Sequence, residues 1–79
     1  MSDEIKTVLD LRGLLCPMPV VKLAKAVKGL AAGELVEATA SDPGVLADIP
    51  AWCKSTGNEL VKMEKGDKVF TFVVRKLAG

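Results

Sequence analysis

With 79 residues, 49% of them hydrophobic, the chain has the size and composition of one small globular domain, residues 1–79, rather than of a disordered protein. Eleven Lys and Arg against ten Asp and Glu leave a net charge of +1, without the basic excess typical of nucleic-acid-binding or membrane-surface proteins. Two cysteines and no histidine cannot form a four-ligand zinc site within one chain, so we expect neither metal nor cofactor.

We expect no secretory signal at the start of the chain. Met1-Ser2-Asp3-Glu4 is acidic and has no apolar segment behind it. The apolar runs fall far short of the roughly 20 residues that span a bilayer. We therefore expect a cytoplasmic protein, with no membrane partner, whose thiols are reduced at rest.

The first half of the sequence predicts a strand, a helix and a strand. Residues 5–11 alternate imperfectly, with Ile5, Thr7, Leu9 and Leu11 on the face expected to be buried. Residues 18–28 carry apolar side chains at helical spacing and predict a helix over about 18–29, with Lys22, Lys25 and Lys28 on its solvated side. Residues 35–40 alternate again and predict the second strand.

The second half predicts a helix followed by a hairpin. Ser41-Asp42-Pro43-Gly44 is typical of a helix start, with Asp42 as N-cap and Pro43 at the first helical position. We expect this helix to run to about Ser55, with a kink at Pro50 or a restart capped by Asp48. Residues 60–65 and 68–75 flank Gly66-Asp67, which suits a two-residue type II′ turn.

The order βαβαββ predicts an α/β two-layer sandwich. Right-handed crossovers would place both helices on one face of a mixed four-stranded sheet. Val8, Leu35 and one set of hairpin residues would then lie on the open face. That face is either a docking or dimer surface or a surface with isolated apolar residues, and we expect a monomer.

Cys16 is the residue that the sequence predicts to be a reactive thiol. It stands just before the first helix, where the partial positive charge of a helix N-terminus favours a thiolate over a thiol. Pro17 and Pro19 stiffen the turn and fit the first helical turn, where their missing N–H groups cost nothing. Arg12 could add positive potential. The alternative is that Cys16 is a small buried hydrophobe.

Other polar and sulfur-bearing residues have two interpretations each. Asp10 either accepts hydrogen bonds from backbone N–H groups and holds the turn or is merely solvated. Gly13 is expected to adopt a backbone conformation that other residue types rarely adopt. Cys53 lies on the apolar side of the second helix as a core thiol, or else is a resolving partner for Cys16, which would need Cα atoms within about 7 Å. Trp52 is expected to anchor the core.

The segment Asp10-Leu11-Arg12-Gly13-Leu14-Leu15-Cys16-Pro17-Met18-Pro19 resembles the signature of the TusA/SirA family, a Cys-Pro-x-Pro motif after Asp-x-x-Gly. The likeness continues through residues 40–44 and 48–60, so it covers nearly the whole chain. It implies that Cys16 accepts a sulfane sulfur as a persulfide, with Asp10, Arg12, Gly13, Pro17 and Pro19 as the supporting motif. It also implies a sheet whose last strand inserts antiparallel between the second and third.

The resemblance implies a sulfur carrier rather than a stand-alone enzyme. The donor would be a cysteine desulfurase or another persulfidated sulfurtransferase, and the recipient another protein cysteine. Family members serve tRNA thiolation, molybdenum cofactor assembly or cytoplasmic sulfur relay. Two alternatives remain: a thiol redox or regulatory protein acting through Cys16 disulfides, and a small RNA-binding module, against which the balanced charge and the lack of tyrosine argue.

Overall fold

A computed structural model describes residues 5–15 and 18–77 of the chain. Its elements follow the predicted βαβαββ order. They are β1 (Ile5–Leu11), α1 (Met18–Lys28), β2 (Leu35–Ala40), α2 (Val45–Thr56), β3 (Glu59–Lys65) and β4 (Phe70–Arg75).

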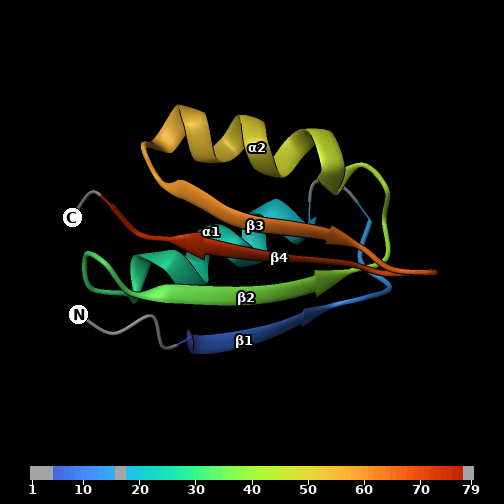
Figure 1. The fold of residues 1–79 in the computed structure, drawn as a ribbon, viewed down its shortest axis with the longest axis horizontal. Coiled ribbons are helices and arrows are strands. Elements are labelled where there is room, and N and C mark those ends of the chain that lie inside the picture. Colours follow the sequence, from blue (N-terminus) through green and yellow to red (C-terminus); the bar gives the residue numbers. More distant parts are fainter. Residues whose placement is uncertain (1–4, 16–17, 78–79) are drawn as a thin grey trace.

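The strands form one mixed sheet in the order β1-β2-β4-β3 (Figure 1). β1 and β2 are parallel, whereas β4 is antiparallel to both of its neighbours. β4 therefore lies between β2 and β3, as the family resemblance implies. Among the described residues, no helix has the length and apolar character needed to cross a membrane.

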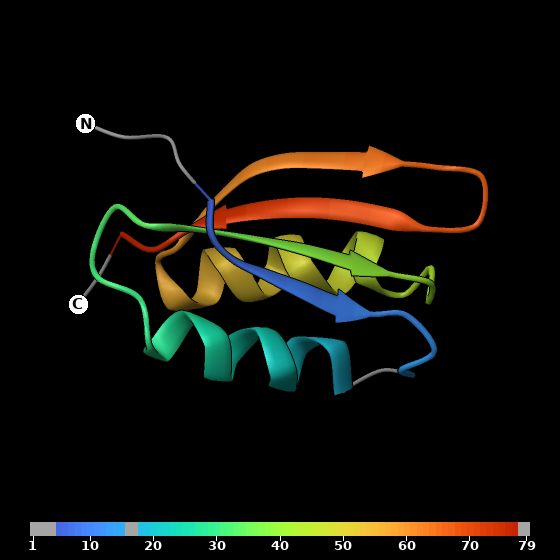
Figure 2. The same cartoon turned by 90° about the horizontal axis from the view of Figure 1, so that it is seen from below.

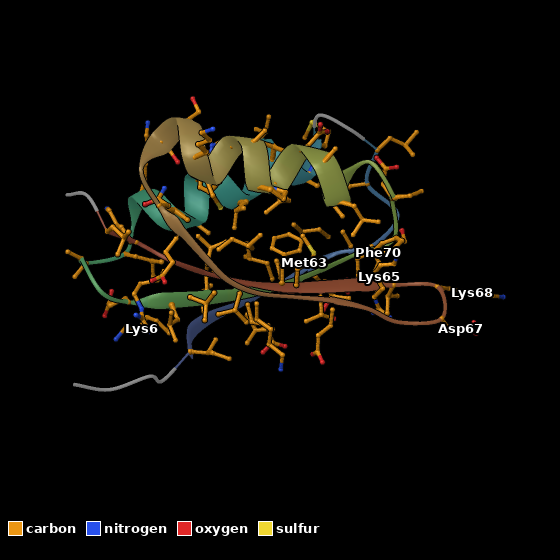
Figure 3. All side chains as sticks on the ribbon, turned by 45° about the horizontal axis from the view of Figure 1, so that its top comes forward. Lys6, Met63, Lys65, Asp67, Lys68 and Phe70 are labelled. Carbon is orange, nitrogen blue, oxygen red and sulfur yellow. The ribbon has the colours of Figure 1, made fainter. Side chains whose placement is uncertain are left out.

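Both helices cover the same face of the sheet, so the predicted two-layer sandwich is confirmed (Figure 2). The core lies between these layers, and Leu23 of α1, Ile49 of α2 and Phe72 of β4 are all 0% exposed. Figure 3 shows Met63 and Phe70 reaching from the sheet into this space, where both pack against the buried cluster. The apolar stripes of the helices supply the other half of the core.

The two edge strands depart from regular alternation. In β1, Ile5 pairs with Leu35 and Thr7 with Val36, so the register shifts at Lys6. Because Leu35 and Val36 point to opposite faces of β2, so do Ile5 and Thr7. The expectation that Ile5 shares the buried face was wrong, and its side chain is 40% exposed.

The hairpin turn lies one residue later than predicted. Lys65 still pairs with Phe70, and the Gly66 N–H donates to the Val69 carbonyl at 2.7 Å. Asp67 and Lys68 consequently form the tip, as Figure 3 shows. Gly66 does not have the positive φ that a type II′ turn requires at its first central residue, so that prediction was wrong.

The start and continuity of α2 also correct the prediction. The helix begins at Val45, after a turn in which the Val45 N–H donates to the Asp42 carbonyl. Gly44, rather than Asp42, occupies the N-cap position, and the Asp42 carboxylate accepts the Gly44 N–H at 3.2 Å within the turn before the helix. The helix continues through Pro50 without a restart and ends at Gly57, whose φ is 77°.

The open face of the sheet mixes apolar and charged side chains. Val8 is 70% exposed, but Leu35 and Val73 are nearly covered although they lie outside the core cluster. Ion pairs flank them, with Arg75 and Glu59 at 3.4 Å on β4 and β3. The long side chains of such pairs cover apolar surface with their methylene groups.

We predict that Leu23→Ala lowers the free energy of unfolding by about 2–5 kcal/mol, because it leaves a cavity in a fully buried site. The matched control is Leu77→Ala at a position that is 53% exposed, where we expect a change within about 0.5 kcal/mol. Urea unfolding followed by circular dichroism measures both. Equal losses in the two variants would contradict the assigned core.

Candidate functional site

The candidate site lies at the edge of the sheet where β1 and β2 both end. Leu11 and Ala40 form the last parallel pair, so the segments that follow them begin side by side. Residues 12–15 lead from β1 toward α1, and residues 41–44 lead from β2 to α2. Of the predicted site residues, Asp10, Arg12, Gly13 and Pro19 are described; Cys16 and Pro17 lie outside the described residues.

Asp10 and Arg12 form a compact ion pair at the end of β1. The Asp10 carboxylate accepts hydrogen bonds from Arg12 Nε at 2.8 Å, from Arg12 Nη2 at 3.0 Å and from the Arg12 backbone N–H at 3.2 Å. Of the two interpretations of Asp10, the structure therefore favours the one in which it holds the turn. The Arg12 charge is met by a carboxylate, so the pair adds a local dipole rather than a free positive charge.

Hydrogen bonds from Arg12 lower the pKa of Asp10 from its ordinary 3.8 to about 2. The side-chain bond contributes most, followed by the backbone bond. The same pairing raises the pKa of the Arg12 guanidinium. Both groups therefore stay charged over the whole physiological pH range.

Gly13 turns the chain away from the sheet with a φ of +83°. This is the left-handed region, which suits glycine, as the sequence predicted. The Gly13 N–H donates to Ser41 Oγ at 2.8 Å, across 28 residues of sequence. The next residue, Leu14, donates its N–H to the Leu11 carbonyl and packs against the core.

α1 begins at Met18, two residues after Cys16 in the sequence. Its first turn contains no acidic side chain, and Pro19, which has no N–H, is fully buried. The Met18 N–H is already bonded to the Leu15 carbonyl at 2.9 Å. The first backbone N–H in this turn that could stabilise an anion is therefore that of Val20. The sequence alone also allowed the Met18 N–H.

Exposed apolar side chains stand on both sides of Cys16-Pro17 in the sequence. Leu15 is 74% exposed and Met18 is 41% exposed. Further along α1, Val21 is 39% exposed, and Lys22 is exposed beside it. The surface near the start of α1 thus combines apolar contacts with a lysine.

Cys53 has the environment predicted for a core thiol. Its side chain is 3% exposed and belongs to the buried cluster under α2. Burial raises the pKa of the Cys53 thiol to about 11. A protonated and enclosed sulfur is a poor nucleophile, so this residue is unsuited to exchange with partner proteins.

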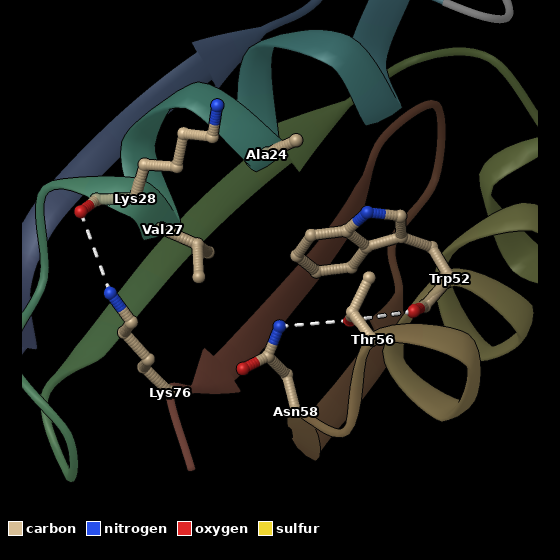
Figure 4. Close-up of a pocket in the computed structure, with 7 residues that line it drawn as sticks. All are labelled: Ala24, Val27, Lys28, Trp52, Thr56, Asn58 and Lys76. Atoms are coloured by element: carbon tan, nitrogen blue, oxygen red, sulfur yellow. Dashed lines mark hydrogen bonds between the residues drawn. The ribbon is translucent and has the colours of Figure 1, made fainter. Parts of the chain in front are cut away.

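A shallow groove of about 240 Å³ lies between the second halves of α1 and α2 (Figure 4). Trp52 forms one wall and also packs against the core, so it is an anchor with one face open. Two of the polar side chains around it bond to backbone carbonyls: Thr56 Oγ1 donates to the Trp52 carbonyl and Lys76 Nζ donates to the Leu30 carbonyl. The groove lies beside the C-terminal half of α1, away from its start at Met18.

A second depression of about 270 Å³ adjoins the site on the open face of the sheet. It is lined by Val8, Leu9, Asp10, Arg12 and Thr39. The Asp10–Arg12 ion pair forms part of its wall.

Sequence reasoning missed Ser41 as a member of this site. It treated Ser41 only as the residue before the expected N-cap. The signal that could have identified it is topological, because residues that follow two parallel neighbouring strands emerge at the same edge.

Comparisons with known proteins agree with the resemblance in the sequence. The family model described as sulfurtransferase TusA matches residues 7–76. A candidate sulfur carrier protein of Halobacterium salinarum is 47% identical over 74 residues, covering 92% of this chain and 91% of the relative. The sulfur carrier protein TusA of Pseudomonas aeruginosa is 37% identical over 78 residues, covering 99% of both chains.

A solved structure supports the fold. The crystal structure of a SirA-like protein from Desulfitobacterium hafniense has a TM-score of 0.78 and 22% identity. The match covers 91% of this chain and 99% of that one. At this identity the likeness bears on the two-layer architecture alone.

We predict that Asp10 titrates with a midpoint of about 2 and that Arg12→Ala moves the midpoint up toward 3.8. Because the folded-state pKa is lowered, the contribution of this pair to stability is present above about pH 4 and is lost as the pH falls toward 2. Carbon NMR of the Asp10 carboxyl group measures the midpoint. A wild-type midpoint near 3.8 would contradict the hydrogen-bonded pair.

We predict that the Cys53 thiol reacts with a chromogenic disulfide at least about a hundredfold more slowly in the folded protein than in denaturant, because a closed native state exposes it only during opening. The measurement uses Cys16→Ser, so that Cys53 is the remaining thiol. Similar rates with and without denaturant would contradict the assignment of Cys53 to the buried core.

Proposed function

The chain belongs to the TusA family of sulfur carrier proteins, and from this premise we propose that it carries sulfane sulfur as a persulfide on Cys16. The observation that carries the proposal is the edge formed by β1, β2 and α1. There, a loop held by the Asp10–Arg12 pair and by Gly13 leads through the exposed Leu15 to the start of a helix.

The proposed reaction is two successive attacks of a thiolate on sulfur. The Cys16 thiolate attacks the terminal sulfur of a donor protein's cysteine persulfide, a new S–S bond forms on Cys16, and the donor cysteine leaves as a thiolate. An acceptor cysteine thiolate then attacks the terminal sulfur on Cys16. The terminal sulfur passes to the acceptor, and Cys16 leaves as a thiolate. One sulfur atom moves at each step, and no external oxidant or reductant is consumed.

Electrostatics at the start of α1 support a thiolate at this position. The N-terminal end of a helix carries about half a positive charge, which stabilises a neighbouring anion by about 0.3–1 kcal/mol at an exposed site. The first turn of α1 has no acidic side chain to oppose this effect. Asp10, the acidic residue of the motif, has its charge compensated by Arg12.

The surroundings suit contact with other proteins. Leu15 and Met18 expose apolar surface on either side of the Cys16-Pro17 dipeptide in the sequence, and Lys22 adds a positive charge on α1. Protein partners can cover such a patch and exclude water from the two sulfur atoms. We propose a cysteine desulfurase or another persulfidated sulfurtransferase as donor and a protein cysteine as acceptor, within a cytoplasmic pathway such as tRNA thiolation, molybdenum cofactor assembly or sulfur relay.

The two alternative functions receive less support. A redox role with an internal Cys16–Cys53 disulfide would require a thiol that is 3% exposed to leave the core. An RNA-binding role usually relies on exposed aromatic rings on which bases stack. Here Phe70 and Phe72 face the core side of β4, and Trp52 is half-buried under α2.

We predict that incubation with a cysteine desulfurase and free cysteine adds one sulfur atom to the wild-type protein. Intact-mass spectrometry measures the addition, which should disappear after treatment with a reductant. Cys16→Ser should remain unmodified, because the attacking sulfur is missing.

Cys53→Ala is the matched control, because it removes the other thiol while leaving the proposed carrier intact. It should acquire the sulfur as the wild type does. Modification of Cys16→Ser, or a wild-type protein that forms only mixed disulfides with the desulfurase, would reject the carrier function.

A further inference from the structure

We propose that the groove between the second halves of α1 and α2 is a docking site for an acidic segment of a partner protein. The segment would insert one aromatic or large aliphatic side chain and place carboxylates beside it. The depression, here named the Trp52 groove, is lined by Ala24, Val27, Lys28, Trp52, Thr56, Asn58 and Lys76. It contains none of the residues of the Cys-Pro-x-Pro motif, so this inference does not rest on the sulfur-carrier function.

Apolar side chains form the wall and the floor of the Trp52 groove. Trp52 packs against the core but is only half-buried, so part of its ring surface is open to the groove. Val27 and Ala24 of α1 lie across from it, as Figure 4 shows. An apolar side chain laid between them would remove both the indole ring and these methyl groups from water, which favours binding.

Two lysines lie on the side of the groove opposite Trp52 (Figure 4). Lys28 belongs to the last turn of α1, and Lys76 follows β4. None of the described residues that line the groove carries a carboxylate, and within the described part of the chain Lys28 forms no ion pair. Because the whole chain has a net charge of only +1, the two ammonium groups are a local concentration of positive charge, complementary to an acidic partner.

The C-terminal ends of both helices carry partial negative charge, which by itself would oppose an anion here. Hydrogen-bond donors compensate that charge. Lys76 Nζ donates to the Leu30 carbonyl at 2.7 Å and lies 3.4 Å from the Lys28 carbonyl, while Thr56 Oγ1 and the Gly57 N–H donate to carbonyls of α2. The Lys28 ammonium group takes no part in this capping, so it is available to a carboxylate of a partner.

The size of the groove favours one side chain of a protein over a free small molecule. Its volume of about 240 Å³ is below the roughly 300–1,000 Å³ of pockets that enclose a drug-sized ligand. A large side chain that fills a small pocket, with polar contacts around it, is the usual anchor of a protein interface. The partner therefore presents an aromatic or large aliphatic residue with aspartate or glutamate next to it.

Single-stranded RNA fits the same groove less well. Proteins that bind it offer several aromatic rings, on which successive bases stack, and a basic groove that follows the phosphate backbone. The Trp52 groove contains one aromatic ring and two lysines, and the rings of Phe70 and Phe72 pack on the core side of the sheet.

The test titrates the full chain with a synthetic peptide in which one phenylalanine is flanked by two glutamates on each side, with both ends blocked. Trp52 is the single tryptophan of the chain, and the chain has no tyrosine, so tryptophan fluorescence reports on the groove directly. The peptide contains no tryptophan and is silent in this measurement. Two control peptides replace the glutamates by lysines or the phenylalanine by alanine.

We expect a saturable shift of the Trp52 emission to shorter wavelength, because the phenylalanine displaces water from the indole ring. Lys28→Glu should weaken binding at least about fivefold, since a repulsive pair replaces an attractive one. Lys25→Glu is the matched control, because it makes the same change of net charge in the last turn of α1 at a residue that does not line the groove, and it should weaken binding less than about twofold. Ala24→Met fills the groove without changing the charge and should abolish the saturable shift, with circular dichroism verifying the fold of each variant.

The absence of a saturable shift would overturn the proposal, and so would equal binding of either control peptide or equal losses in Lys25→Glu and Lys28→Glu. Three further results would overturn it by assigning the groove to another occupant. These are tighter binding of N-acetylphenylalanine alone, tighter binding of oligouridylate, and a shift that follows protein concentration without peptide, which would indicate a second copy of the chain. No sulfur donor enters the experiment, so its failure is separate from a failure of the carrier function.

Discussion

The parallel pairing of β1 with β2 is the constraint on which the site depends. Parallel strands end at the same edge of a sheet, and each is followed here by a helix that starts at that edge. The pairing therefore gathers the Gly13 turn, Ser41 and the start of α1 from three separate parts of the sequence. β4, inserted beside β2, locks this pair from the other side by antiparallel bonds along its whole length.

The electrostatic potential at this edge of the sheet is weak, because the charged side chains there are paired with each other. Arg12 is paired with Asp10, so neither residue carries an uncompensated charge. Solvent screens what remains, and a helix dipole at an exposed position is worth about 1 kcal/mol at most. The proposed function would benefit from this moderation, because the Cys16 sulfur would act first as attacking group and then as leaving group.

The sequence predicts the elements well because helix and strand periods are local properties. β2 matches its expected range, and the buried faces of both helices follow the apolar spacing. Register is less predictable, since an irregularity such as the one at Lys6 reverses every side chain on one side of it. The position of the hairpin tip was also predicted wrongly, because glycine and aspartate at 66 and 67 are typical of a turn but do not show which two residues form its tip. The bond from Gly13 to Ser41 depends on strand pairing, which no local pattern encodes.

The irregularities that escaped prediction have a common physical consequence. β1 shifts register at Lys6 and β3 shifts register between Leu60 and Lys62, so both edge strands carry a break beside a lysine. Breaks and charges on edge strands hinder the pairing of one sheet with the edge of another. The proposed function, in which a thiol and apolar side chains meet partner proteins, would need such protection elsewhere. The two edges parallel to the strands therefore each carry a register break beside a lysine, whereas Gly13 and Ser41 lie at the end of the sheet.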